Sequence, residues 1–101
     1  MNLEEIHTIL KAVTGSEGVS YAVTKEYFTR SGIIDGRMIS ESLFDEVYER
    51  LSPNREHLDL SKFIQLFGML ARNTRQDVEA LAIKFDNIKE SVIDGIRKGK
   101  S

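Results

Sequence analysis

Apolar residues recur at helical spacing along most of the chain. Within residues 2–14, Leu3, Ile6, Leu10 and Val13 lie at i, i+3, i+7 and i+10, which places them on one face of a helix. The same periodicity predicts further helices over residues 25–31, between Ser40 and Pro53, from Phe63 to Asn73 and from Val78 to Val92. The pattern therefore predicts an all-α fold with about five helices.

Residues suited to helix ends separate these segments. Gly32 is expected to end the second helix, because glycine adopts a positive φ without strain. Asn2 with Glu5 resembles a capping pair, in which the asparagine side chain accepts from a backbone N–H of the first turn. Helix starts are predicted at Asn2, Thr24, Ser40 and Thr74.

Two short β-prone runs, residues 18–23 and 56–63, interrupt the helical pattern. Each follows a helix and a polar loop and precedes another helix, so the layout occurs twice. This is the outline of a paired EF-hand, in which the two runs pair as a minimal two-stranded β-ribbon. We therefore expect an EF-hand-like helical domain over residues 1–92, followed by a basic, frayed tail over residues 93–101.

The second loop lacks the ligands of a calcium site. A calcium loop needs oxygen ligands at positions 1, 3, 5 and 9 and a bidentate Glu at position 12. With Leu58 at the apolar position 8, Leu51, Pro53 and Arg55 fall at positions 1, 3 and 5, and Lys62 at position 12. A cation in place of the carboxylate argues against calcium binding.

The first loop has two registers, and neither supplies a cage of oxygen ligands. With Val19 at position 8, position 12 is Val23; with Tyr21 there, position 12 is Lys25. We therefore expect degenerate loops, no metal site and calcium-independent behaviour.

Composition and charge narrow the function classes. The 101 residues fit one domain, and a net charge of −2 offers no basic field for nucleic acid. There is no cysteine for disulfides or thiolate metal sites, and no apolar run long enough to span a bilayer. The first residues lack a basic leader. We expect a soluble cytoplasmic protein that contacts neither nucleic acid nor membrane.

No group of residues forms a catalytic pattern. Adjacent carboxylates such as Glu4 and Glu5 do not face each other on a helix. The serines lack a nucleophile-elbow context. His7 and His57 are too few for a zinc site. We predict no catalytic residue, no cofactor and no enzymatic activity.

The segment "GIIDGR" carries a family resemblance. Together with "ISESLFDEVYERL" and "HLDLSKFIQLFGMLA" it resembles the core domain of the tubulin polymerization-promoting protein family. The resemblance covers roughly residues 1–90 and is most specific between Tyr27 and Ala71. Its structural signature here is Gly32, Ile34, Asp35, Gly36 and Arg37.

The resemblance implies a protein that binds tubulin and promotes microtubule polymerisation, bundling or stabilisation. Relatives in single-celled eukaryotes are associated with cilia, flagella and basal bodies. Two features of the family have no counterpart here. The chain lacks the cysteine involved in the family's zinc-linked behaviour, and "GIRKGKS" lacks the setting of a nucleotide-binding loop.

Three interpretations of particular residues follow. Asp35, Gly36 and Arg37 form either a binding turn or a connector whose Asp35 bonds local backbone amides, and we favour the connector. Ile33, Ile34 and Ile39 should anchor it in the core. The stripe from Val78 to Val92 favours packing within the chain over dimerisation, and the oligomeric state stays open.

Cationic residues in the C-terminal third are candidates for contact with the acidic tails of tubulin. They alternate with acidic residues, so we favour a mixed solvated face over a basic binding strip. An alternative function is a calcium-independent adaptor that holds a partner's amphipathic helix in a groove lined by Phe44, Tyr48, Phe63 and Phe67. The candidate partner-binding residues are Arg72, Arg75, Lys84, Lys89, Arg97 and Lys98.

Overall fold

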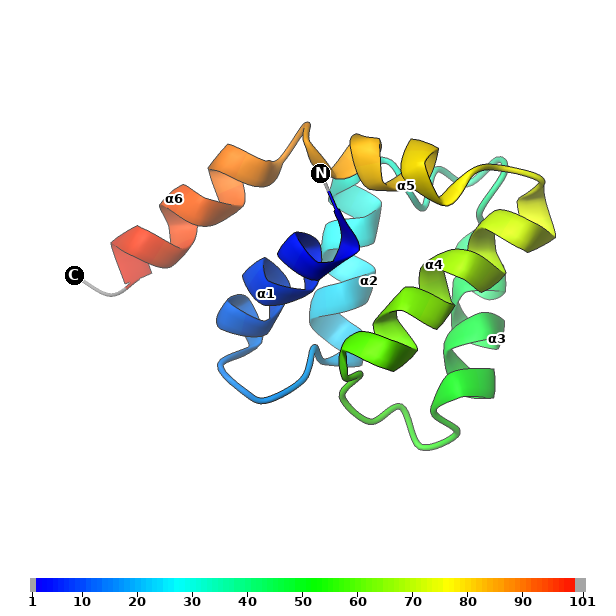
Figure 1. The fold of residues 1–101 in the computed structure, drawn as a ribbon, viewed down its shortest axis with the longest axis horizontal. Coiled ribbons are helices and arrows are strands. Elements are labelled where there is room, and N and C mark those ends of the chain that lie inside the picture. The colour runs from blue at the N-terminus through cyan, green and yellow to red at the C-terminus, as the bar shows by residue number, and fades with distance from the viewer. Residues whose placement is uncertain (1, 100–101) are drawn as a thin grey trace.

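The computed structural model describes residues 2–99, and its elements are all helices, as the periodicity predicted (Figure 1). The first four helices form two helix–loop–helix units, and α5 lies across one end of them. None of the described helices is long and apolar enough to cross a membrane. The helices are α1 (Leu3–Thr14), α2 (Tyr21–Ser31), α3 (Glu41–Leu51), α4 (Leu60–Thr74), α5 (Val78–Phe85) and α6 (Lys89–Gly99).

The number of helices corrects the sequence-based expectation. The single helix expected from Val78 to Val92 is broken after Phe85, so residues 2–99 contain six helices instead of five. At the break, the N–H groups of Asp86, Asn87 and Ile88 bond carbonyls three residues earlier, which closes a tight turn. The turn lets α5 bury Leu81 and Phe85 while α6 returns to pack mainly on α1.

The expected β-ribbon is a single antiparallel bridge between Val19 and Leu58. The N–H of each donates to the carbonyl of the other, at 3.0 and 2.9 Å. The bridge does not extend into longer strands, because helix caps follow it directly on both segments. Ser20 accepts from the N–H of Val23 and Asp59 accepts from that of Lys62, so α2 and α4 begin directly after the bridge.

The cap of α2 was therefore predicted wrongly. Thr24 is buried inside the helix, where its hydroxyl donates to the carbonyl of Ser20. The Asn2 and Ser40 caps are confirmed, since their side chains accept from the N–H groups of Glu5 and Leu43. Thr74 is the last residue of α4, and Asp77 precedes α5 without a side-chain cap bond.

A group of phenylalanine rings packs together within the core. The ring of Phe28 on α2 meets those of Phe44, Phe63 and Phe67 edge to face, with centroids 5.1–6.1 Å apart. All four rings are fully buried, and edge-to-face pairs stabilise a core beyond the area they bury. The two helix–loop–helix units therefore share one core, with α2 in contact with both helices of the second unit.

The C-terminal segment is helical where frayed structure was expected. Residues 93–99 lie in α6, and the expected boundary at residue 92 falls within that helix. Val92 is buried, which fixes α6 against the rest of the chain. Residues 100–101 of the expected tail lie outside the described part of the chain, as does residue 1.

Candidate functional site

The signature turn between α2 and α3 is built around Asp35. One oxygen of its carboxylate accepts hydrogen bonds from the N–H groups of Arg37, Met38 and Ile39 at 2.8, 2.9 and 3.2 Å. Gly36 has φ +78°, a conformation that glycine adopts without strain. The bond from Arg37, reinforced by the other two and the Lys84 charge, outweighs burial and lowers the pKa of Asp35.

These contacts show that Asp35 bonds backbone amides of its own loop, as the connector interpretation predicts. Ile33, Ile34 and Ile39 are buried and anchor the turn, as predicted. Gly32 ends α2 with φ +89°, and its carbonyl lies 3.5 Å from the ammonium nitrogen of Lys84 on α5. On the rim of the turn, Met38 is 50% accessible.

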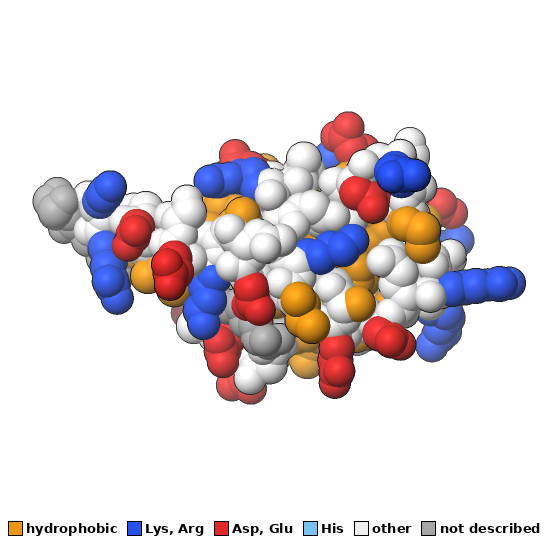
Figure 2. Space-filling model, turned by 90° about the horizontal axis from the view of Figure 1, so that it is seen from above, with side chains coloured by type: hydrophobic (Ala, Val, Ile, Leu, Met, Phe, Trp, Pro, Cys, Tyr) orange, Lys and Arg blue, Asp and Glu red, His pale blue; other side chains and the backbone are white. Residues whose placement is uncertain are grey.

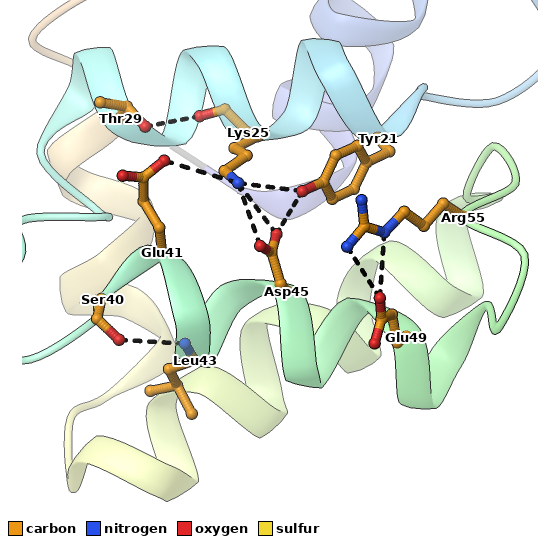
Figure 3. A network of polar contacts seen from close by, with 9 residues as sticks. All are labelled: Tyr21, Lys25, Thr29, Ser40, Glu41, Leu43, Asp45, Glu49 and Arg55. Carbon is orange, nitrogen blue, oxygen red and sulfur yellow. Dashed lines mark hydrogen bonds and ion pairs between the residues drawn. The ribbon is translucent and has the colours of Figure 1, made fainter.

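A polar cluster joins α2 to α3 (Figure 3). The Tyr21 hydroxyl donates to the carboxylate of Asp45. The ammonium of Lys25 lies 3.2 Å from both oxygens of that carboxylate and 3.1 Å from the Tyr21 hydroxyl. Glu41 adds a longer ion pair to Lys25, at 3.6 Å. The guanidinium of Arg55 lies over the Tyr21 ring, 4.5 Å from the ring centroid.

The charges in this α2–α3 cluster stabilise one another. Burial alone would raise the pKa of Asp45, but the hydrogen bonds from Tyr21 and Lys25 outweigh it and lower the pKa. The hydrogen bond to Tyr21 is the largest cause that raises the pKa of Lys25, and the hydrogen bond and charge of Asp45 raise it further. Together they outweigh burial, which lowers this pKa. Tyr21 and Lys25 face Asp45 from the neighbouring helix, so the arrangement holds the two helices together.

Sequence reasoning missed this cluster. It placed Tyr21 in a β-prone run and considered Lys25 only as a degenerate calcium ligand. The available signal was spacing: Tyr21 and Lys25 are four residues apart, as are Glu41 and Asp45, so each pair shares a helix face. Nothing local indicated that the two faces meet.

The six candidate cationic residues do not form one strip. Arg72 and Arg75 lie at the end of α4, and Arg97 and Lys98 lie in the last turn of α6, at the opposite end of the molecule in Figure 1. Between them, Lys84 approaches Gly32 and Lys89 pairs with Glu5 at 3.6 Å. Acidic side chains alternate with basic ones on the face shown in Figure 2.

The groove required by the adaptor alternative is closed. Phe44, Tyr48, Phe63 and Phe67 are all fully buried, so no partner helix reaches them in this arrangement. The Tyr48 hydroxyl donates to the carbonyl of Glu56 at 2.6 Å, and burial raises the pKa of Tyr48 to about 12. These four side chains form the core here.

The two histidines hold the loops in place. His7 is buried against the ring of Phe63, and its Nε2 donates to the carbonyl of Leu58, 3.1 Å away, at the interloop bridge. His57 is exposed, and its Nδ1 lies 3.1 Å from the hydroxyl of Ser16. Within residues 2–99, no three His, Cys, Asp or Glu side chains gather where they could hold a metal ion.

Comparison of the chain with protein-family models, with curated proteins and with solved structures gave no match. The resemblance to the tubulin polymerization-promoting protein family therefore rests on the sequence segments described above and stays a prediction.

Proposed function

We propose that the chain is a non-enzymatic cytoskeletal protein that binds tubulin and promotes microtubule polymerisation, bundling or stabilisation. The observation that carries this proposal is the turn centred on Asp35. It joins two helix–loop–helix units at the place where the resembling family carries its Ile-Asp-Gly-Arg segment. Association with cilia, flagella or basal bodies in the cytoplasm belongs to the same proposal.

The proposed scaffold is a paired EF-hand-like core with degenerate loops. The bridge between Val19 and Leu58 supports this reading, because it pairs the residues assigned to position 8 of the two loops. It favours the first register for the first loop, with Val23 at position 12. Position 12 of the second loop is the exposed Lys62. Calcium is therefore not expected to regulate the protein.

Co-sedimentation with microtubules at low and moderate salt tests the proposed function. We expect the protein to pellet with microtubules at low salt and less at moderate salt, because ions screen attraction between exposed charges. Tubulin polymerisation followed by turbidity would show whether binding promotes assembly. If the protein stays in the supernatant at both salt concentrations, the proposal is wrong.

Calcium independence has a separate test. Amide NMR shifts of residues in both loops should not change when millimolar Ca²⁺ is added. Saturable shifts of the amides around Val19 or Leu58 would contradict the degenerate-loop assignment while leaving tubulin binding open.

A further inference from the structure

A groove remains open where α6 packs on α1. It lies between α1, α2 and α6 and has a volume of about 590 Å³. Val13 of α1, Tyr27 of α2, and Val92 and Ile96 of α6 form apolar walls. Val13, Tyr27 and Ile96 are each partly exposed, so a ligand in the groove would bury apolar surface that now faces solvent.

The charge in the groove lining is positive. Arg30 is exposed, and its guanidinium lies over the ring of Tyr27, 4.9 Å from the ring centroid. Among the described residues that line the groove it is the only charged one, and no carboxylate lines it. The acidic residues of α6, Glu90 and Asp94, are exposed outside this lining. A negatively charged ligand would therefore complement the groove.

Gly95 keeps the groove open. It lies within α6, where a glycine costs roughly 0.5–1 kcal/mol relative to alanine. A Cβ added to Gly95 would meet nothing within 4 Å, so close packing does not require this glycine. A larger side chain at this position would therefore start in open space at the wall of the groove.

We propose that this groove binds an acidic peptide segment that carries an apolar side chain. The apolar residue packs between the partly exposed Val13, Tyr27 and Ile96, and a neighbouring carboxylate accepts charge-assisted hydrogen bonds from the guanidinium of Arg30. We assign this peptide segment to the acidic tails of tubulin, an assignment that rests on the proposed function. The groove thus supplies a defined site that the scattered cationic residues do not.

The test compares two glycine variants of the full chain. Gly95→Leu fills the groove, whereas Gly68→Leu places the same residue at another helical glycine whose added Cβ also meets nothing within 4 Å. A glutamate-rich peptide with one phenylalanine is titrated into each protein while methyl NMR follows Val13, Val92 and Ile96. A lysine-rich peptide with the same phenylalanine controls for charge.

We expect the acidic peptide to shift the methyl signals of these three residues in the wild type and in Gly68→Leu. Gly95→Leu and Arg30→Ala should each weaken binding about tenfold, the equivalent of roughly 1.4 kcal/mol. The basic peptide should cause no shift. Absence of shifts with the acidic peptide, or equal binding by Gly95→Leu and Gly68→Leu, would overturn the proposal.

Microtubule pelleting separates this inference from the proposed function. If the wild type pellets and Gly95→Leu pellets equally well, the groove is not the tubulin site although the proposed function stands. If the wild type does not pellet but the acidic peptide still shifts the groove methyl groups, the proposed function fails. The groove then remains a site for acidic peptides from another source.

Discussion

At the scale of single residues, Asp35 stabilises the connector through three backbone N–H groups. Asp35→Ala should lower the free energy of unfolding by about 1 kcal/mol, the usual cost of removing such a carboxylate cap. Because folding lowers the pKa of Asp35, its contribution is present above the unfolded pKa of about 3.9 and is lost as pH falls through the folded pKa.

Urea denaturation at pH 7 and at decreasing acidic pH measures both effects. Asp35→Asn is the matched control, because it keeps an acceptor oxygen in place. It should retain most of the stability at pH 7 and lose less than the wild type on acidification. An Asp35→Ala variant as stable as the wild type would show that the turn does not depend on this side chain.

Gly18 matters for a different reason, the close approach of the two loops. Its φ is ordinary, but an added Cβ would lie 2.9 Å from the carbonyl oxygen of Leu58. Gly18→Ala should therefore strain the interloop bridge and destabilise the fold by about 1–3 kcal/mol. Gly68→Ala, in open space within α4, should instead stabilise it by up to about 1 kcal/mol.

Thermal unfolding and amide hydrogen exchange at Val19 and Leu58 measure this pair of variants. Faster exchange at these two amides in Gly18→Ala would locate the strain at the bridge. Unchanged stability and exchange would mean that the loops separate at no cost, which would remove the reason for a glycine at position 18.

At the scale of elements, Asp45 adds polar contacts to the aromatic packing between α2 and α3. Its side chain is 29% accessible and binds both Tyr21 and Lys25. Asp45→Ala should destabilise the protein by about 1.5–3 kcal/mol, because hydrogen bonds to a charged group are lost in a half-buried setting. Since its pKa is lowered by folding, this stability too is present at neutral pH and lost on acidification below about pH 4.

Glu46→Ala is the matched control on the same helix. Glu46 pairs with Arg50 at 3.1 Å, but both side chains are 60% accessible, so the loss should stay below about 0.5 kcal/mol. Chemical denaturation of the two variants compares them directly. Equal losses would show that the α2–α3 cluster contributes no more than an ordinary surface ion pair.

The same elements show what the sequence could predict. Periodicity located the helices because burying one face imposes a fixed spacing, and the roles of Gly32 and Asp35 followed from backbone chemistry confined to a few residues. The start of α2 at Tyr21 could not be predicted in this way, because the bridge from Val19 to the distant Leu58 decides it. The break after Phe85 likewise reflects α6 packing on α1, a contact that the apolar stripe does not encode.

The groove and the α2–α3 cluster were beyond sequence reasoning for the same physical reason. Tyr21 and Asp45 are 24 residues apart, and the groove combines residues of α1, α2 and α6. Each contributes an unremarkable local pattern, and only the packing of helices brings them together. The candidate cationic residues are close in sequence, but the fold places Arg72 and Arg75 on α4 and Arg97 and Lys98 on α6.

At the scale of the whole molecule, this division of charge makes a prediction about the proposed tubulin binding. The longest axis is 41 Å, while the Debye length at physiological ionic strength is about 8 Å, so charges at the two ends act independently. Arg97 and Lys98 lie in the last turn of α6, which is one of the three helices that line the groove. Arg72 and Arg75 lie at the far end of α4.

We therefore expect the double variant Arg97→Glu with Lys98→Glu to reduce microtubule pelleting more than Arg72→Glu with Arg75→Glu. Combining all four changes should add the two effects, because distant and independent sites are additive within about 0.5 kcal/mol. Pelleting across a salt series, with circular dichroism to check folding, measures this. A larger loss from the α4 pair would place the tubulin contact at the α4 end, away from the groove, and a strongly non-additive result would mean that one partner surface spans both ends.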